Sequence, residues 1–495
     1  MAIDHAVFVV FGASGDLAKK KTFPALFGLY RQDELPKTTK IFGYARSKLT
    51  NEEFHDKFRS NLKLLNDSQQ PKIDQFLGIT EYFNGSYDDP EAYKRLELAI
   101  QQFEKSQSIA TPNRIYYLAL PPSVFATVAA NLKKYNHNGK VKLIVEKPFG
   151  HDLPSAKELQ AQLAPLFSED ELFRIDHYLG KELVKNLLVL RFGNEIFNAS
   201  WNKNHIQSIQ ISFKEPFGTE GRGGYFDSIG IIRDVIQNHL LQVLTLLTME
   251  RPTNFKPESI RDEKVKVLKA FAPIDQNDIL VGQYVASRDG SKPGYLDDST
   301  VNPDSKCITY AAIGLKIENE RWDGVPIVVR AGKALNESKV EVRIQFKQVA
   351  KGVFNSIQKN ELVLRIQPKP AVYLKLNSKI PGLSNKFSIT DLDLTYGSRY
   401  NDFWIPEAYE SLIRDALHDE HSNFVRDDEL ELSWGLFTPL LNYLEGPNAP
   451  TPLGYHYGDR GVPGLEQFLA KHGYEIQDRD AYQWPVTRPD ILEKI

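Results

Sequence analysis

His177 and Lys181 lie four residues apart, just after Asp176, and carry the kinds of side chain that bind a phosphate group. They occur in the string RIDHYLGKE (174–182), which follows an apolar pair at 172–173, so we expect a strand to end here and a helix to begin. Asp176 is a favoured N-cap residue, and His177 and Lys181 would share one face of the first helical turn. Two potential cations at a helix N-terminus oppose the helix dipole, and a bound anion would resolve that conflict. The string therefore predicts a phosphate pocket; the alternative is a solvated helix start with two surface side chains.

His239 is the best candidate for a general base. Oxidation of an alcohol needs a group that takes the hydroxyl proton while hydride leaves the same carbon, and histidine titrates near neutral pH. His239 lies beside the apolar stripe of a predicted helix, 229–249. A carboxylate should orient its other ring nitrogen; Asp234 lies about 140° away around an α-helix, so Asp176 is predicted for this role. The alternative is a helix histidine that only satisfies a buried hydrogen bond.

A glycine-containing loop follows the first apolar strand. Residues 6–11 are continuously apolar, and GASGDLAKKK (12–21) comes directly after them. Glycines allow a tight turn and let the backbone approach a pyrophosphate at a helix N-terminus. The string is neither the usual G-x-G-x-x-G nor a Walker loop, so glycines kept only for turn geometry are the alternative. Its position after the first strand favours a dinucleotide loop.

Arg46 ends the next predicted strand, 40–45. At this position an acid binds the ribose 2′-hydroxyl of NAD, whereas an arginine accommodates the 2′-phosphate of NADP. Arg46 therefore indicates NADP, with an exposed strand-end arginine as the alternative.

Strands and helices alternate up to about residue 175, which predicts a doubly wound, Rossmann-like parallel sheet. Ligands of such sheets bind beyond the carboxyl ends of the strands. That rule places Gly12, Arg46, Lys147 and Asp176 along one edge. We therefore predict a dinucleotide-binding domain at 1–175, in the α/β class.

Beyond residue 200 the apolar residues alternate with polar ones, as at 209–213 and 340–346. Period-2 runs predict a mainly antiparallel sheet with one covered face. Further strands are expected at 308–317, 325–330, 362–367 and 371–376, and the Pro- and Gly-rich stretch 446–464 is expected to be a long loop. We therefore predict a larger α+β domain at 176–495 that binds substrate, mediates oligomerisation and has helices over its sheet.

The composition is that of an ordinary soluble globular protein of 495 residues, with a formal net charge of −3. This charge gives no case for nucleic acid or anionic membrane as a partner. A single cysteine, Cys307, excludes an intrachain disulfide and a multi-cysteine zinc site, and no metal site is predicted. With no signal-type segment and no apolar run of membrane-spanning length, a cytoplasmic location is expected.

Six strings of the chain, at 12–21, 146–150, 174–182, 214–224, 231–239 and 330–336, resemble the glucose-6-phosphate dehydrogenase family of eukaryotic type. The resemblance extends along nearly the whole length. It implies oxidation of D-glucose 6-phosphate to 6-phospho-D-glucono-1,5-lactone with NADP⁺, the first step of the oxidative pentose phosphate pathway. It also implies a homodimer or homotetramer.

The resemblance assigns roles to individual residues. His239 would be the base and Asp176 its orienting acid. The phosphate would be held by His177, Tyr178, Lys181 and Lys333, and the sugar hydroxyls by Lys147, Glu215 and Asp234. NADP would be bound by Gly12, Ala13, Ser14, Gly15, Asp16, Leu17, Ala18, Lys19, Arg46 and Lys147.

Some members of the family carry a second, structural NADP. The residues that resemble that site are Arg330, Lys339, Arg343, Arg365, Tyr373, Lys375, Arg460 and Trp484. This chain departs from those members at Ser338, where they have a basic residue, and that change weakens the inference. Phe125 replaces a tyrosine that some members have beside the catalytic cofactor.

Two other functions fit parts of the sequence. A different sugar oxidoreductase would explain Gly12 and Lys147, but only a phosphorylated substrate requires His177 with Lys181. A nucleotide-sensing scaffold that binds NADP(H) and a partner protein would have no use for His239. Turnover of glucose against glucose 6-phosphate separates the first alternative from our prediction, and a His239→Asn variant separates the second.

Overall fold

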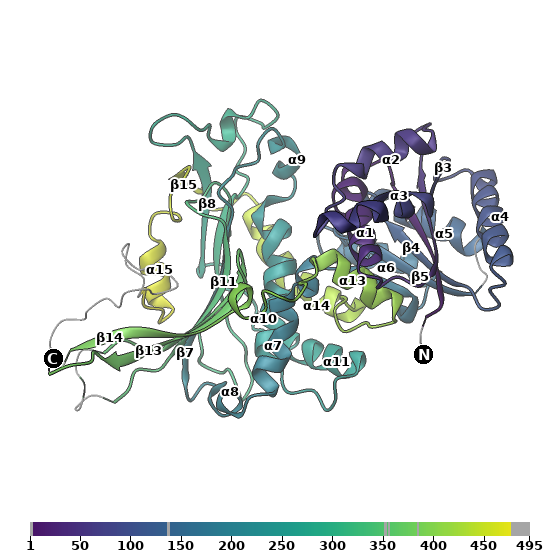
Figure 1. Ribbon diagram of the computed structural model, residues 1–495. Coiled ribbons are helices and arrows are strands. Elements are labelled where there is room, and N and C mark those ends of the chain that lie inside the picture. Colours follow the sequence, from purple (N-terminus) through teal and green to yellow (C-terminus); the bar gives the residue numbers. More distant parts are fainter. Residues whose placement is uncertain (1–2, 136–138, 351–353, 355–356, 384–385, 477–495) are drawn as a thin grey trace. The chain divides into compact units, whose positions relative to one another are not determined.

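The computed structural model describes residues 3–135, 139–350, 354, 357–383 and 386–476 (Figure 1). The chain forms two compact units. The first contains 1–182, 252–263 and 405–432, and the second contains 183–251, 264–404 and 433–495. The predicted division at 175/176 assigns segments 252–263 and 405–432 to the second domain, whereas in the structure both pack with the first unit.

The first unit is built on a six-stranded sheet, and the predicted doubly wound fold is confirmed. All its strands pair in parallel, in the order β3-β2-β1-β4-β5-β6. The strands are β1 (His5–Phe11), β2 (Thr38–Ala45), β3 (Thr80–Asn84), β4 (Asn113–Leu118), β5 (Lys140–Glu146) and β6 (Leu172–Ile175). Most of their residues are buried, which is why they read as continuous apolar runs. The order reverses between β1 and β4, the point where such folds bind ligands.

Helices cover this sheet and hold the connections in place. They include α1 (Phe23–Arg31), α2 (Asn51–Arg59), α3 (Gln70–Gly78), α4 (Pro90–Ser106), α5 (Phe125–Tyr135), α6 (Leu153–Leu163) and α13 (Ala408–Leu417). Helix α2 starts at a capping box of Thr50 and Glu53, as the sequence indicates. Helix α4 is fastened to β4 by the fully buried Arg114, which forms ion pairs with Glu97 and Glu104 at 2.9 and 2.7 Å.

The second unit is built on a nine-stranded mixed sheet in the order β14-β13-β12-β11-β7-β10-β9-β8-β15. Its strands are β7 (Ile206–Lys214), β8 (Ile279–Val285), β9 (Tyr310–Leu315), β10 (Ile327–Gly332), β11 (Lys339–Phe346), β12 (Glu361–Gln367), β13 (Ala371–Lys379), β14 (Phe387–Thr395) and β15 (Leu453–His456). The predicted antiparallel pairing holds except that β7 pairs with β10, and β8 with β15, in parallel. Strand β15 lies inside the stretch 446–464, so the prediction of an uninterrupted loop there is wrong.

Helical segments pack on this second sheet. Helices α7 (Glu182–Phe192) and α10 (Leu241–Thr248) lie along it (Figure 1). The segment before α10, η6 (Ile232–Leu240), contacts β10 and buries Val235, Ile236 and Leu240. Across the part of the chain that the structure describes, every helix falls short of the length or apolar character that a membrane crossing requires.

Candidate active site

Asp176 lies where the buried strand β6 gives way to a single 3-10 turn, η5 (His177–Gly180). Its carboxylate accepts a hydrogen bond from the Tyr178 backbone N–H at 3.0 Å, so the predicted N-cap is present. The predicted helix start is wrong in one respect. Lys181 has an extended backbone (φ −73°, ψ 135°) that separates the turn from α7, so His177 and Lys181 do not share the first turn of one α-helix.

Lys181 is a largely buried cation with a second lysine nearby. Burial lowers the pKa of its ammonium group, and Lys21 lowers it further, while the carboxylates of Glu407 and Asp176 act in the opposite direction. The ammonium lies 4.8 Å from the ring centroid of Tyr178, within cation–π range. The neighbourhood therefore holds two ammonium groups as well as two carboxylates, and ammonium groups are donors of the kind that bind a phosphate.

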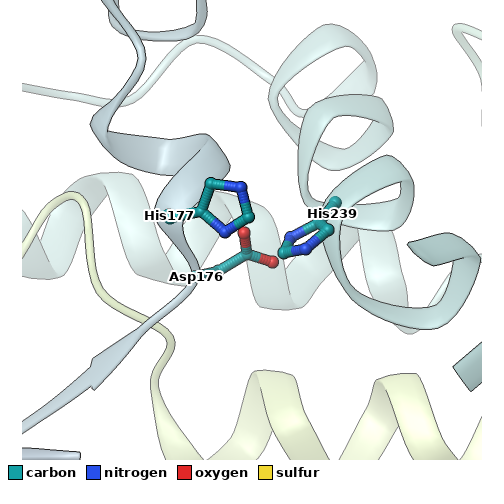
Figure 2. A group of neighbouring side chains, drawn as sticks. All are labelled: Asp176, His177 and His239. Carbon is teal, nitrogen blue, oxygen red and sulfur yellow. The ribbon is translucent and has the colours of Figure 1, made fainter. Parts of the chain in front are cut away.

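His177 is half-buried and held by two aromatic rings. Its imidazole makes an edge contact with Tyr178 at a centroid distance of 5.0 Å. It also lies parallel to the ring of Tyr409, at 6.0 Å and 7°. Figure 2 shows the side chains of Asp176 and His177 next to one another at the strand end. The turn η5 therefore presents a carboxylate, an imidazole and, just after it, an ammonium group.

The glycine loop makes the tight turn that its sequence predicts. Gly12 has φ +77°, and a Cβ built there would lie 2.2 Å from the Ala119 carbonyl oxygen, so no other residue fits. The Gly12 N–H donates to the Tyr44 carbonyl at 2.9 Å, and the Gly15 N–H donates back to the Gly12 carbonyl at 2.9 Å. The loop continues into a π-helical turn, η1 (Ala18–Thr22), and α1. The turn is therefore made by backbone alone at Gly12, as a loop that approaches a pyrophosphate requires.

Arg46 follows β2, and its guanidinium lies over the ring of Tyr87, 5.6 Å from the centroid. Burial raises the pKa of Tyr87, while Arg46 and the Gly12 backbone act in the opposite direction. Tyr87 therefore lies beside both the arginine and the glycine loop. Sequence reasoning missed this residue because the only signal is an aromatic in the connection after β3.

The parallel sheet puts four of the predicted residues at one edge. Gly12, Arg46, Lys147 and Asp176 follow the carboxyl ends of β1, β2, β5 and β6, respectively. This is the arrangement that the strand order predicts.

The second unit assembles a different cluster around Lys333. Its Nζ lies 2.6 Å from Glu215 Oε2 and 3.3 Å from Asp234 Oδ2. Burial opposes the charge of Lys333, but the carboxylates of Asp234 and Glu215 outweigh burial and raise the pKa of the ammonium. The three residues come from the end of β10, the end of β7 and η6, and they form a polar cluster whose carboxylates can accept hydrogen bonds from hydroxyl groups.

His239 is 3% exposed and lies near the end of η6 (Figure 2). The predicted helix 229–249 is therefore not one α-helix but a π-helical segment followed by α10. Residues five apart approach the same face of a π-helix. The angle of about 140° that an α-helix would put between Asp234 and His239 therefore does not apply, and it does not exclude Asp234 as the acid that orients His239. Asp234 is instead engaged with Lys333.

A cavity of about 1300 Å³ opens in the second unit, and neither Lys333 nor His239 belongs to its lining. Six of the residues predicted for a structural NADP line it: Arg330, Lys339, Arg343, Arg365, Tyr373 and Arg460. Lys375 is buried, with its Nζ 3.9 Å from the Glu361 carboxylate, and Trp484 lies outside the described residues. Lys214 also lines the cavity, where burial and nearby cations lower its pKa to about 8. Basic side chains outnumber acidic ones in the lining, so the cavity favours a large anion.

The two parts of the chain match two domain models of the same protein family. Residues 9–186 match the family described as "Glucose-6-phosphate dehydrogenase, NAD binding domain", and residues 188–484 match "Glucose-6-phosphate dehydrogenase, C-terminal domain".

Individual proteins match over nearly the full chain. Glucose-6-phosphate 1-dehydrogenase of Kluyveromyces lactis is 66% identical over 491 residues, covering 99% of both chains. That of Saccharomyces cerevisiae is 64% identical, covering 98% of this chain and 97% of the relative. A solved glucose-6-phosphate dehydrogenase in complex with its substrate glucose-6-phosphate superposes with a TM-score of 0.94 at 65% identity, covering 97% and 100% of the two chains. A Mycobacterium avium glucose-6-phosphate 1-dehydrogenase superposes with a TM-score of 0.80 at 33% identity, covering 98% and 100%.

Proposed function

This chain belongs to the glucose-6-phosphate dehydrogenase family, and we propose on that basis that it oxidises D-glucose 6-phosphate to 6-phospho-D-glucono-1,5-lactone with NADP⁺ as hydride acceptor. The reaction would supply NADPH as the first step of the oxidative pentose phosphate pathway, in the cytoplasm. The observation that carries the proposal is the 65% identity and near-complete coverage shared with the solved substrate complex.

A direct assay tests the proposal. NADP⁺ reduction should be rapid with glucose 6-phosphate and slow with glucose at equal concentration, because only the phosphorylated sugar uses the cations of the pocket. Equal rates with the two sugars would contradict the proposal and favour a different sugar oxidoreductase.

The cofactor preference rests on residues of the first unit. The Gly12 turn has no space for a side chain, and Arg46 over Tyr87 offers a fixed cation at the end of β2. These features fit a dinucleotide whose ribose carries a 2′-phosphate. Residues 12–19, Arg46 and Lys147 would hold this cofactor, which accepts hydride when bound.

Replacing Arg46 by alanine is expected to raise the KM for NADP⁺ about 10- to 100-fold, because a charge-assisted contact to phosphate contributes about 1.5–3 kcal/mol. The KM for NAD⁺, which lacks the 2′-phosphate, should change less than about threefold. Steady-state kinetics with both cofactors check this. Arg59→Ala, on the exposed end of α2, is the matched control. Equal increases for NADP⁺ and NAD⁺ would argue against a role in selectivity.

For the chemical step we assign His239 as the base that takes the proton of the anomeric hydroxyl. Asp176 would orient the imidazole and stabilise the imidazolium that forms. The supporting observations are the burial of both residues and the hydrogen bond that fixes Asp176 as an N-cap.

For substrate binding we assign the two clusters to different parts of the sugar phosphate. The phosphate would be bound by His177, Tyr178, Lys181 and Lys333, and the sugar hydroxyls by Lys147, Glu215 and Asp234. The ion pairs of Lys333 support this, because two carboxylates keep the lysine charged while leaving acceptor positions for hydroxyl groups.

A second proposal concerns the basic cavity of the second unit, which would hold a structural NADP in a homodimer or homotetramer. The size of the cavity and the excess of basic side chains support it. Its lining differs from the catalytic residues, so the two sites can be tested separately.

NADP⁺ is expected to raise the melting temperature of the Arg46→Ala variant, because the structural site remains intact; a ligand at 100 times its Kd stabilises by about 2.7 kcal/mol. Adding Arg460→Ala, an exposed residue of the cavity lining, should remove most of that remaining shift. Thermal denaturation with and without NADP⁺ measures both. Loss of the whole shift in Arg46→Ala alone would show a single site.

A further inference from the structure

The start of helix α13 packs unusually closely on the turn η5. A Cβ built on Gly180 would lie 2.4 Å from the Ala408 carbonyl oxygen and 2.8 Å from Leu412 Cγ. The first turn of α13 is itself fixed by a capping box, in which the Glu407 N–H donates to the Glu410 carboxylate at 2.8 Å. Helix α13 therefore has a set position relative to the turn that carries His177.

Tyr409, in the first turn of α13, contacts His177 directly. Its ring is parallel to the imidazole within 7°, at a centroid separation of 6.0 Å, which is an offset stacked arrangement. Tyr178 contacts the same imidazole edge-on. The ring plane of His177 is thus set partly by a residue of a distant segment.

The Tyr409 hydroxyl lies near a buried carboxylate. This carboxylate belongs to Glu146, the last residue of β5, and together with burial it raises the pKa of Tyr409. Glu146 is 4% exposed and also accepts a hydrogen bond from the hydroxyl of the buried Tyr117 on β4. Glu146 pairs with Ile175 across the sheet, so the carboxylate comes from the strand next to the one that Asp176 follows.

We propose that Tyr409 is a positioning residue for the phosphate-binding imidazole: its ring sets the plane of His177, and the Glu146 carboxylate, which is fixed by Tyr117, lies beside its hydroxyl. A fixed imidazole loses less conformational freedom when it donates to a phosphate oxygen, so substrate binding is stronger. This inference rests on the proposed role of His177 in binding the phosphate. None of the three supporting residues touches substrate in this scheme.

The ionisation of Glu146 gives the arrangement a pH dependence. Burial raises its pKa to about 7, and Asp176 adds to this, while Lys147 and the hydroxyls of Tyr117 and Tyr409 act in the opposite direction. Above this pH the carboxylate is charged, accepts the hydrogen bond from Tyr117 and lies beside the Tyr409 hydroxyl. As the pH falls through about 7 it becomes protonated and holds Tyr409 less firmly.

Two substitutions of Tyr409 test the proposal. Tyr409→Phe keeps the ring and removes the hydroxyl, and it should raise the KM for glucose 6-phosphate about fivefold with kcat within about twofold of the parent. Tyr409→Leu also removes the ring and should raise the KM further. The kcat/KM for glucose, which has no phosphate, should be unchanged in both. Tyr30→Phe, a hydroxyl deletion in α1 of the same unit, is the control and should match the parent.

A double-mutant cycle with His177→Ala separates positioning from a general structural role. In the His177→Ala background, Tyr409→Phe should have no further effect on the KM, because the ring that it positions is gone. Additive effects of the two changes would overturn the proposal, as would equal losses with glucose and glucose 6-phosphate. Glu146→Gln should raise the KM for glucose 6-phosphate as Tyr409→Phe does. In the parent enzyme the KM should rise as the pH falls below about 7, and this rise should be absent in Glu146→Gln. A parent enzyme inactive on glucose 6-phosphate would instead refute the proposed function.

Discussion

Replacing His239 with asparagine is expected to lower kcat by about 10²–10⁴-fold, the usual contribution of a positioned general base. Asparagine fills a similar volume and can donate a hydrogen bond, but it cannot take the proton from the anomeric hydroxyl. The base acts on the transition state, so the Kd for glucose 6-phosphate should change little. Steady-state kinetics together with calorimetric titration of the sugar phosphate measure the two quantities.

The control for this variant is His205→Asn, an exposed histidine that precedes β7 in the same unit. Its kcat should equal that of the parent. A His239→Asn enzyme with full activity would remove His239 from the chemical step and would favour a nucleotide-binding scaffold as the function. A matching loss of substrate affinity would indicate that His239 binds the sugar rather than moving a proton.

The sequence predicts best those parts of the structure that are determined by residues adjacent in the chain. Residues 6–11 are apolar without interruption because β1 is buried on both faces of a parallel sheet. Gly12 follows directly, and the structure shows that its φ of +77° and its contact with Ala119 allow nothing larger. A strand and a turn set by adjacent residues leave a clear pattern, so the first unit and its ligand edge could be predicted.

The parts that the sequence does not predict depend on contacts between distant segments. Lys181 reads as part of a helix, yet its extended backbone is set where η5 meets the start of α13. The side-chain spacing around His239 fits an α-helix, whereas η6 is π-helical, a difference that apolar periodicity does not show. Tyr409 gives no signal at all, because its contact with His177 exists only once segment 405–432 packs with the first unit.

The residues that we propose to bind the substrate come from two clusters, one in each unit. The first unit supplies the glycine loop and the imidazole of His177, whereas the second supplies the charged cluster around Lys333. Residues of both units are assigned to one sugar phosphate, so substrate affinity should depend on either cluster. This dependence makes Lys181, the lysine of the first unit that we propose to bind the phosphate, a sharp test.

Replacing Lys181 with alanine is expected to raise the KM for glucose 6-phosphate about 10- to 100-fold, because a hydrogen bond to a charged group contributes about 1.5–3 kcal/mol. The kcat at saturating substrate should stay within about threefold, since the ammonium binds the phosphate equally in the ground and transition states. Initial rates over a range of substrate concentrations give both constants. Lys94→Ala, an exposed lysine of α4, is the matched control, and an unchanged KM in Lys181→Ala would remove Lys181 from the phosphate site.

The pH dependence of the same variant series identifies the charge itself as the cause. Burial lowers the pKa of Lys181 below the usual value for lysine, so the parent should lose substrate affinity as the pH rises through this lowered pKa. Lys181→Arg keeps its charge at any accessible pH and should retain affinity where the parent loses it. Identical alkaline profiles for the parent and Lys181→Arg would mean that another group controls binding in this range. If the loss of substrate affinity moves to higher pH in Lys181→Arg, the Lys181 ammonium group causes the loss in the parent.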